Sequence, residues 1–207
     1  MRMTTDLLRL AQWLSPTFPL SAYAYSHGLE AACADGRVRD VSTCRDWVEA
    51  VLLYGTGALD AWAIRAVMAG ASAEEAAAVL RARAGSAERW RETREMGAAF
   101  VRATVATGEP PIPDLPLPVA LALRARGMDR RVVVALYLQA LAAQLVSAAV
   151  RLVPLGQSAG QAVLTALHPT LARIADEVPA DPPGSAALLA EFDAMRHETL
   201  EPRIFRT

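Results

Sequence analysis

Few residues of this 207-residue chain have the types and spacing that chemistry requires. Ser26 and His27 stand side by side and could suggest a nucleophile with its general base. Neighbours on a helix do not face each other, however, and no acid that would orient the histidine is evident nearby. We interpret Tyr23, Tyr25, Ser26 and His27 as aromatic packing plus a surface contact, and we predict no catalytic residue.

The other histidines and the two cysteines are too scattered to predict a metal site. His168 and His197 lie in segments remote from His27, and no HxxxH or HExxH motif pairs two of them on one helix. Cys33 and Cys44 form no CxxC motif and have no second pair, so they are interpreted as free structural thiols. We predict no metal ligands and no cofactor.

The composition excludes several further classes of protein. The chain contains no lysine, which excludes a Walker A, Schiff-base or kinase-type lysine. Its net charge of −1 offers no bulk attraction for nucleic acid, and its 53% apolar content excludes a disordered chain. The first 13 residues lack the apolar core of a signal peptide, so a cytoplasmic address is the expectation.

A long uncharged stretch organises the fold prediction. No charged residue lies between Arg131 and Arg151, and the stretch is dominated by the good helix formers Ala and Leu. Asp129 can cap the start, and Pro154 and Gly156 end the pattern. We predict an apolar helix over about 129–153, buried at the centre of the fold.

This helix could also be long enough to cross a membrane. Its alanine content and the polar Gln139, Gln144 and Ser147 favour a protein core instead. Each glutamine would then need a hydrogen-bond partner from a surrounding helix.

Helical periodicity recurs along the rest of the chain, and no sustained alternation indicates a strand. The predicted helices cover about 5–14, 22–34, 43–68, 72–85, 86–108, 119–126 and 161–178, with a last one beginning at Ser185. Their expected N-terminal caps are Thr5, Thr43, Ser72 and Ser185, and Ser86 is expected to start its helix. We predict an all-α, single-domain fold over 1–207, with eight to ten helices around the central one.

Two segments are predicted to face outward. The first half of the helix from Ser86 is charged on most faces and is interpreted as a solvated surface. The last helix carries Leu188, Leu189, Phe192 and Met195 on its apolar face. The segment 197–207 then combines arginines with apolar anchors, and we expect it to be either frayed or docked on a partner.

Three motifs in this order resemble one known family. They are SPTFPLSAYAYSHGLE at 15–30, LVSAAVRLVPLGQSAGQ at 145–161 and MRHETLEPRIFRT at 195–207. They resemble the urease accessory protein UreF family, and the likeness spans nearly the whole chain. The resemblance implies an all-α, non-catalytic protein that dimerises and bridges the accessory protein UreD (also called UreH) and the GTPase UreG. That assembly delivers nickel to apo-urease, so the resemblance implies nickel handling by the complex without stable binding to this chain.

Residue by residue, the family's FPxG-aromatic segment falls on 18–23. Tyr23 takes the aromatic position linked to the GTPase, and Ser21 stands where the family usually has Gly. The family's PLGQxxGQ motif includes Gln157 and Gln161.

The family's tail, HExxxxRxxxS or close to it, matches His197, Glu198 and Arg203, with Thr207 in place of Ser. It carries Glu201-Pro202 where Tyr-Ser is common, and it docks on UreD in the family. The residues predicted to bind partners are Tyr23, Tyr25, Ser26, His27, Gln157, Gln161, Arg196, His197, Glu198, Arg203, Phe205 and Arg206.

Two alternatives compete with this interpretation. One is an all-α ligand-binding or enzymatic domain, with a pocket lined by Trp13, Trp47, Trp62 and the tyrosines. The other is a membrane protein anchored by 132–150, which detergent-free solubility would exclude.

Overall fold

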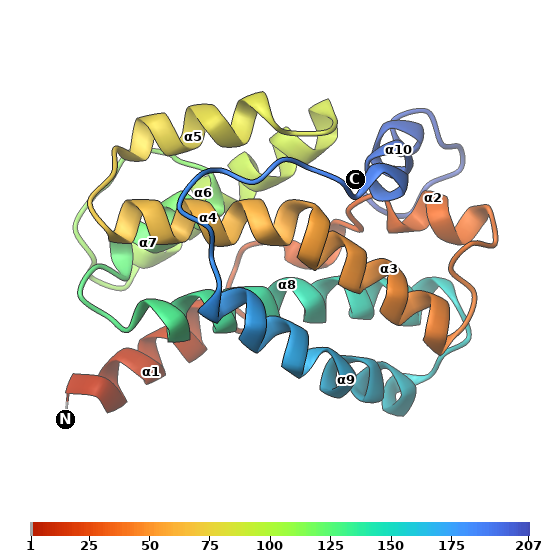
Figure 1. Ribbon diagram of the computed structural model, residues 1–207, viewed down its shortest axis with the longest axis horizontal. Helices are drawn as coiled ribbons and strands as arrows, with labels where there is room; N and C mark the ends of the chain where they lie inside the picture. Colours follow the sequence, from red (N-terminus) through yellow and green to blue (C-terminus); the bar gives the residue numbers. More distant parts are fainter. Residues whose placement is uncertain (1) are drawn as a thin grey trace.

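The computed structural model describes residues 2–207, and within that range the fold is all helical (Figure 1). This confirms the predicted fold class. The elements are α1 (Arg2–Trp13), the 3₁₀ turn η1 (Ala22–Ala24), α2 (Leu29–Ala34), α3 (Val41–Tyr54), α4 (Thr56–Met68), α5 (Ala73–Ala82), α6 (Ala87–Ala106), α7 (Leu117–Arg124), α8 (Arg130–Leu152), α9 (Gln157–Asp176) and α10 (Leu188–His197).

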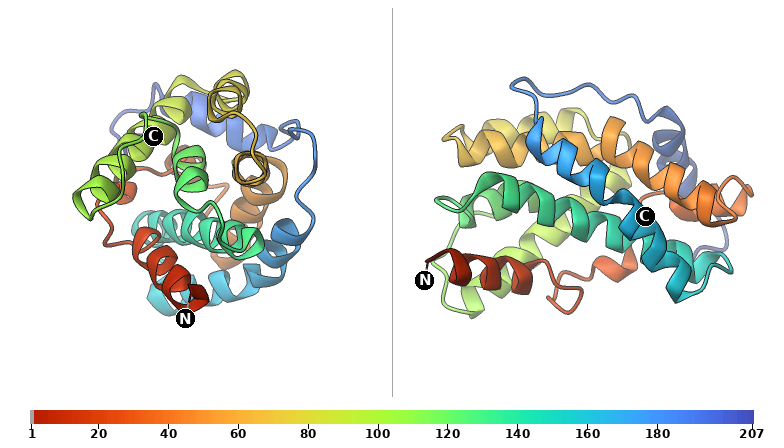
Figure 2. Two further views of the ribbon diagram at one scale, coloured as in Figure 1. Left: turned by 90° about the vertical axis from the view of Figure 1, so that its left-hand side faces the viewer. Right: turned by 60° about the horizontal axis from the view of Figure 1, so that its bottom comes forward.

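Helix α8 is the central element, as its composition predicted. The Asp129 carboxylate accepts from the Arg131 and Val132 N–H groups at 2.9 and 3.3 Å, which confirms the cap. Helix α9 packs along one side of α8, and α2, α3 and α4 pack on others (Figure 2). The buried face of α8 includes Leu138 and Leu145, both fully buried.

The two longest apolar stretches belong to this core. Both Val41–Met68 and Arg130–Leu152 satisfy a membrane span by length and composition. In the fold 61% and 56% of their most apolar windows are buried inside the protein. These helices are therefore core helices, and the membrane alternative has no support from their placement.

The predicted helix over 22–34 is wrong, because the backbone reverses in its middle. His27 and Gly28 adopt φ of 64° and 82°, left-handed values that end one helical segment before α2 begins. A side chain at Gly28 would meet the Ala194 backbone nitrogen at 2.5 Å, so only glycine fits against α10. Ser21 also has positive φ, 58°, at the position where the family usually has Gly.

The other predicted boundaries are partly right. Helix α1 begins before Thr5, so Thr5 is no cap, and Gly55 divides the predicted helix over 43–68 into α3 and α4. Thr43 serves as the third residue of a capping box whose N-cap is Asp40. The Ser72 cap is confirmed, because its hydroxyl group accepts from the Glu75 N–H group at 3.1 Å. The Ser86 hydroxyl group likewise caps α6, accepting from the Arg89 N–H group at 3.1 Å.

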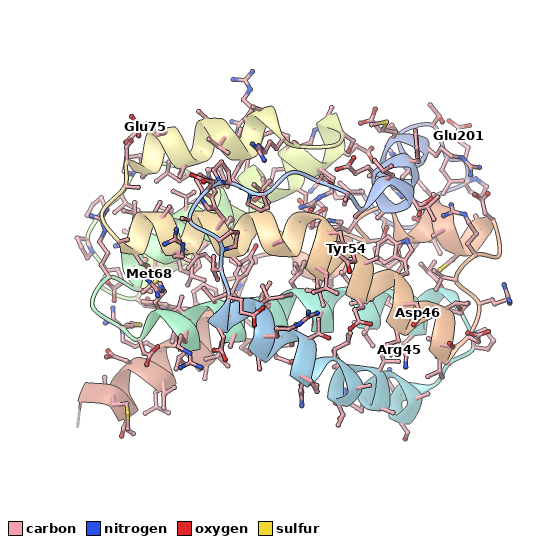
Figure 3. The ribbon with its side chains drawn as sticks, in the orientation of Figure 1. Arg45, Asp46, Tyr54, Met68, Glu75 and Glu201 are labelled. Atoms are coloured by element: carbon pink, nitrogen blue, oxygen red, sulfur yellow. The ribbon has the colours of Figure 1, made fainter. Side chains whose placement is uncertain are left out.

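An extended segment, 177–187, connects α9 to α10 over the α3–α4 pair (Figure 1). The Trp62 indole N–H donates to the Ala180 carbonyl at 3.1 Å, and the Ala186 N–H donates to the Tyr54 carbonyl at 2.7 Å. Figure 3 shows Tyr54 where α3 ends. The predicted cap Ser185 is wrong, because α10 starts at Leu188 and the Ser185 hydroxyl contacts the Tyr54 carbonyl instead.

Candidate functional site

The C-terminal segment 198–207 packs on the chain's own body. The Ser26 N–H donates to the Thr207 carbonyl at 2.7 Å, and the Arg206 N–H donates to the Ala24 carbonyl at 2.8 Å. Phe205 and Thr207 are each only 3% exposed. In this conformation the segment is therefore not frayed, because the body itself supplies its main-chain partners; its docking on a partner stays a prediction.

Glu30 is the main acceptor for this segment. It lies in the first turn of α2 and is buried. Its carboxylate accepts from the Ile204 and Phe205 N–H groups at 2.7 and 2.9 Å, and it faces His197 Nε2 at 3.0 Å. One buried carboxylate thus holds the main chain of the segment and the last residue of α10 together.

The other ring nitrogen of His197 faces a second carboxylate. Its Nδ1 lies 2.9 Å from Glu88 Oε2, and the histidine is fully buried. The Arg203 guanidinium donates to the other Glu88 oxygen at 2.7 Å. We call Glu30, Glu88, His197 and Arg203 the tail clamp.

The charged half of α6 is consequently not the solvated face that its sequence predicts. Glu88 and Glu92 are 5% and 2% exposed. Glu92 accepts from the Thr207 hydroxyl at 2.7 Å and from Gln144 Nε2 at 3.3 Å, and it pairs with Arg89. Burial by itself raises the pKa of Glu92, but Arg89, His27 and Thr207 together lower it below its usual range.

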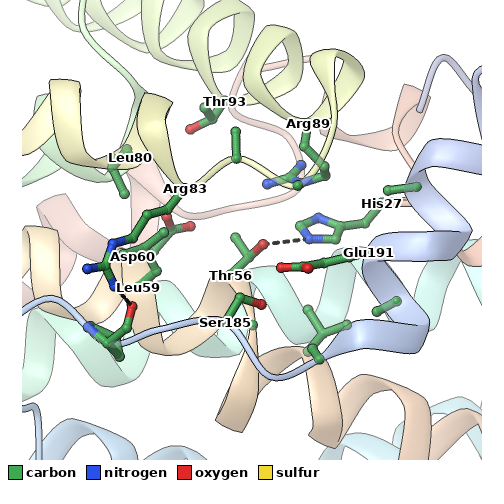
Figure 4. Close-up of a pocket in the computed structure, with 18 of the residues that line it drawn as sticks. His27, Thr56, Leu59, Asp60, Leu80, Arg83, Arg89, Thr93, Ser185 and Glu191 are labelled. Carbon is green, nitrogen blue, oxygen red and sulfur yellow. Dashed lines mark hydrogen bonds between the residues drawn. The ribbon is translucent and has the colours of Figure 1, made fainter.

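A polar cavity of about 60 Å³ lies beside this network (Figure 4). His27 Nε2 is 2.9 Å from the Thr56 hydroxyl, while its Nδ1 has no hydrogen-bond partner. Burial, assisted by the nearby Arg89, lowers the pKa of His27 to about 4. Burial raises the pKa of Asp60 to about 6, although the Tyr137 hydroxyl donates to it at 2.6 Å.

A larger groove of about 400 Å³ runs between α1, α6 and α8. Its lining is mainly apolar and includes Leu10, Leu14, Phe18, Leu136, Ala140 and Phe205. The central helix is therefore not enclosed on every side. Gln144 has the partners predicted for it, whereas the Gln139 side-chain oxygen has none.

The groove is not the aromatic pocket that the ligand-binding alternative requires. Trp13, Trp47 and Trp62 are buried core residues, and none of them lines the groove or the cavity. Of the tyrosines, Tyr23 and Tyr137 line the groove. The groove is thus lined mainly by helix surfaces, and no tryptophan is among its lining residues.

Helix α10 buries charge and exposes apolar side chains. Its inner residues Asp193 and His197 are 1% and 0% exposed. Asp193 accepts from Arg37 Nη1 at 2.9 Å and from the Trp47 indole N–H at 3.0 Å. The outer face consists of Leu188, Leu189, Phe192 and Met195, which are 59%, 67%, 58% and 47% exposed.

The predicted partner-binding residues divide into two sets by their burial. Those on the surface are Tyr23, Gln157, Gln161, Arg196, Glu198, Arg203 and Arg206. Those buried in this conformation are Tyr25, Ser26, His27, His197 and Phe205, so they position other groups here. Sequence reasoning missed Glu30, Glu88 and Glu92; only Glu30 carried a signal, because it lies in the first of the three motifs.

The arrangement offers no nucleophilic pair within residues 2–207. The Ser26 hydroxyl donates to the Thr207 carbonyl, whereas the His27 ring contacts Thr56, so Ser26 and His27 serve different partners. The same part of the chain brings together no group of three His, Cys, Asp or Glu side chains suited to a metal ion. What the site can do chemically is hold a chain segment and present surfaces.

Comparison with known proteins adds an independent finding. The UreF family model matches residues 38–168. A urease accessory protein UreF from Cereibacter sphaeroides (strain KD131) is 51% identical, covering 99% of this chain and all of the relative. Proteins of the same description from Dinoroseobacter shibae and Methylorubrum populi are 48% and 42% identical, covering 99% and 98% of this chain and 100% and 99% of their own lengths.

Proposed function

This chain belongs to the UreF family of urease accessory proteins, which are non-catalytic chaperones, and we propose that it is the bridging scaffold of urease maturation. In this proposal it dimerises in the cytoplasm and connects UreD (UreH) with the GTPase UreG on apo-urease. Nickel is the cargo of that assembly, and GTP hydrolysis by UreG is coupled to its delivery. The chain itself contributes surfaces and no reacting group.

The observation that carries the proposal is the exposure of large apolar side chains at separate places. Helices α1 and α10 lie at opposite ends of the molecule (Figure 1). Met3 and Leu8 on α1 are 75% and 67% exposed, and Leu189 on α10 is 67% exposed. Exposed apolar patches on a folded protein mark contact surfaces, and a scaffold for several partners needs more than one.

We assign UreD to the α10 end. The outer face of α10 adjoins the segment 198–207, whose Ile204 is 70% exposed. Exposed Arg196, Glu198 and Arg203 supply a charged rim around these apolar residues. An apolar centre with a polar rim is the usual composition of a specific interface.

We assign UreG to the surface around Tyr23. The Tyr23 side chain is 75% exposed at the mouth of the groove, and Arg151 donates to its carbonyl at 2.8 Å. Gln157 and Gln161 are exposed on the first turns of α9, shortly after Arg151 in the chain. The second copy of this chain is assigned to α1, whose Leu7 and Leu8 are 42% and 67% exposed.

Co-purification with UreD and UreG tests these assignments together. Phe192→Asp with Leu189→Asp is expected to lose UreD and keep the dimer, while Tyr23→Ala loses UreG alone. Leu8→Asp is expected to give a monomer by light scattering. Val105→Asp on α6 is the control, because Val105 is a 38% exposed apolar residue that is assigned to none of the three surfaces.

The outcome against the proposal is a folded wild-type chain that captures neither partner. In that case a small-molecule screen on the groove becomes the next experiment. If all three surface variants behave like Val105→Asp, the separate-surface assignment fails even though the chain remains a UreF-family protein.

A further inference from the structure

The tail clamp carries an unequal number of fixed charges. Glu30 and Glu88 contribute two carboxylates, while Arg203 contributes one permanent cation. Of the neighbouring charges, Arg37 contacts Asp193, Arg196 contacts Asp35, and Glu198 is exposed to solvent. With both carboxylates ionised, the clamp is neutral only when His197 also carries a positive charge.

The geometry at His197 points the same way. Nε2 lies 3.0 Å from a Glu30 oxygen and Nδ1 lies 2.9 Å from a Glu88 oxygen. A neutral imidazole has one donor nitrogen and one acceptor nitrogen, so its lone pair would face a carboxylate on one side. The imidazolium form donates to both oxygens, and a buried carboxylate that loses its donor is costly.

We infer that His197 is held as a buried imidazolium between Glu30 and Glu88, and that this charge keeps the segment 198–207 docked on the body. Glu30 contacts both His197 and the main chain of the tail. The same carboxylate that faces His197 also accepts from the Ile204 and Phe205 N–H groups, so a change at His197 reaches the tail directly. His197 is thus a positioning residue, and it contacts no partner in this conformation.

The charged groups that face His197 come from every element packed around it. Glu30 belongs to α2, Glu88 to α6 and Arg203 to the tail, whose guanidinium also lies 3.5 Å from the His197 carbonyl. Glu198 is one residue further along and accepts from the Glu88 N–H at 3.3 Å. Removing the cation at position 197 leaves two ionised carboxylates with one cation, which weakens the hold on the tail.

Tryptic cleavage of the tail provides the test, because Arg203 and Arg206 are the cleavage sites. We expect His197→Gln to raise the rate of loss of residues 204–207, followed by intact mass, roughly tenfold or more. His168→Gln is the matched control, because His168 is exposed on α9. Cleavage at a tryptic site outside the tail provides the reference rate for each variant.

A double variant distinguishes an electrostatic role of His197 from a steric one. Glu88→Gln combined with His197→Gln leaves Glu30 and Arg203, a balanced pair, so the double variant is expected to recover much of the protection that His197→Gln loses. A purely steric role would make the double variant worse than either single one. Ring ¹⁵N shifts at neutral pH should show both nitrogens of His197 protonated.

A neutral His197 ring at pH 7, or unchanged tail cleavage in a folded His197→Gln variant, overturns the inference. Neither result bears on the proposed scaffold role, because partner capture is measured separately. Circular dichroism establishes that each variant retains the helical fold before its cleavage rate is compared.

Discussion

Helices α8 and α10 bury side chains of opposite kinds. Helix α8 buries Leu138 and Leu145 completely and has no charged residue between Arg131 and Arg151. Helix α10 buries Asp193 and His197 and exposes Leu189 and other apolar side chains. The difference teaches that α8 is stabilised by apolar area removed from water, whereas α10 is positioned by paired charges. Its apolar face is left for another surface.

The largest effect is expected in α8. Leu145→Ala removes a fully buried side chain and leaves a cavity, so unfolding should become easier by about 2–5 kcal/mol. Urea denaturation measures this change. Leu188→Ala, which truncates the same residue type at a 59% exposed position, is the matched control and should change stability by less than about 0.5 kcal/mol.

The next effect concerns the buried charge of α10. Asp193→Ala leaves the Trp47 indole N–H and the half-exposed Arg37 without their acceptor, and should cost about 2–3 kcal/mol in urea. Asp176→Ala removes a carboxylate that pairs with Arg131 on the surface, and should cost at most about 1 kcal/mol. Equal losses in the two variants would contradict the view that paired charge positions α10.

The polar cavity allows a test by pH. In the folded protein the pKa of Asp60 is raised to about 6. Asp60 therefore stabilises the fold fully at pH values below the pKa that it has in the unfolded chain, and this stabilisation is lost as the pH rises through 6. In the folded protein the pKa of His27 is lowered to about 4. His27 therefore stabilises the fold fully at pH values above the pKa that it has in the unfolded chain, and this stabilisation is lost as the pH falls toward 4. Between pH 4 and pH 6, a fall in pH increases the stabilisation from Asp60 and decreases the stabilisation from His27, so the two effects oppose each other in the wild type.

Asp60→Asn removes one side of that balance. The amide oxygen can still accept from Tyr137, so the variant should be about 1–3 kcal/mol more stable than wild type near neutral pH. The advantage should vanish as pH falls toward 4, and the stability of the variant should then decline with acid because Asp60 no longer opposes the contribution of His27. Urea titrations across this range measure both trends; a constant difference at every pH would show that Asp60 does not titrate within it.

The smallest effect on stability is expected on the outer face of α10. Phe192→Ser alters a 58% exposed side chain and should change the free energy of unfolding by less than about 0.5 kcal/mol. Capture of UreD should nevertheless weaken, because an aromatic anchor is lost from the proposed interface. A large loss of stability would show that this face packs within the chain after all.

The accuracy of the sequence-based predictions follows the same division. The start, the end and the central place of α8 were predictable, because an uncharged run with an Asp cap and a Pro-Gly end constrains the chain locally. The break at His27 and Gly28 was not predictable from periodicity. It follows from the close approach of α10, which is remote in sequence.

The sequence by itself determined the helical class, the central helix, the Ser72 cap and, through three motifs, the family. Those properties depend on neighbouring residues or on whole-chain likeness. Only the tertiary structure decided that Glu88 and Glu92 on the charged half of α6 are buried and that the tail packs on the body of its own chain. The reason is distance along the chain: His197 meets Glu88 and Glu30 across 109 and 167 residues, and no local pattern records which charges will face each other.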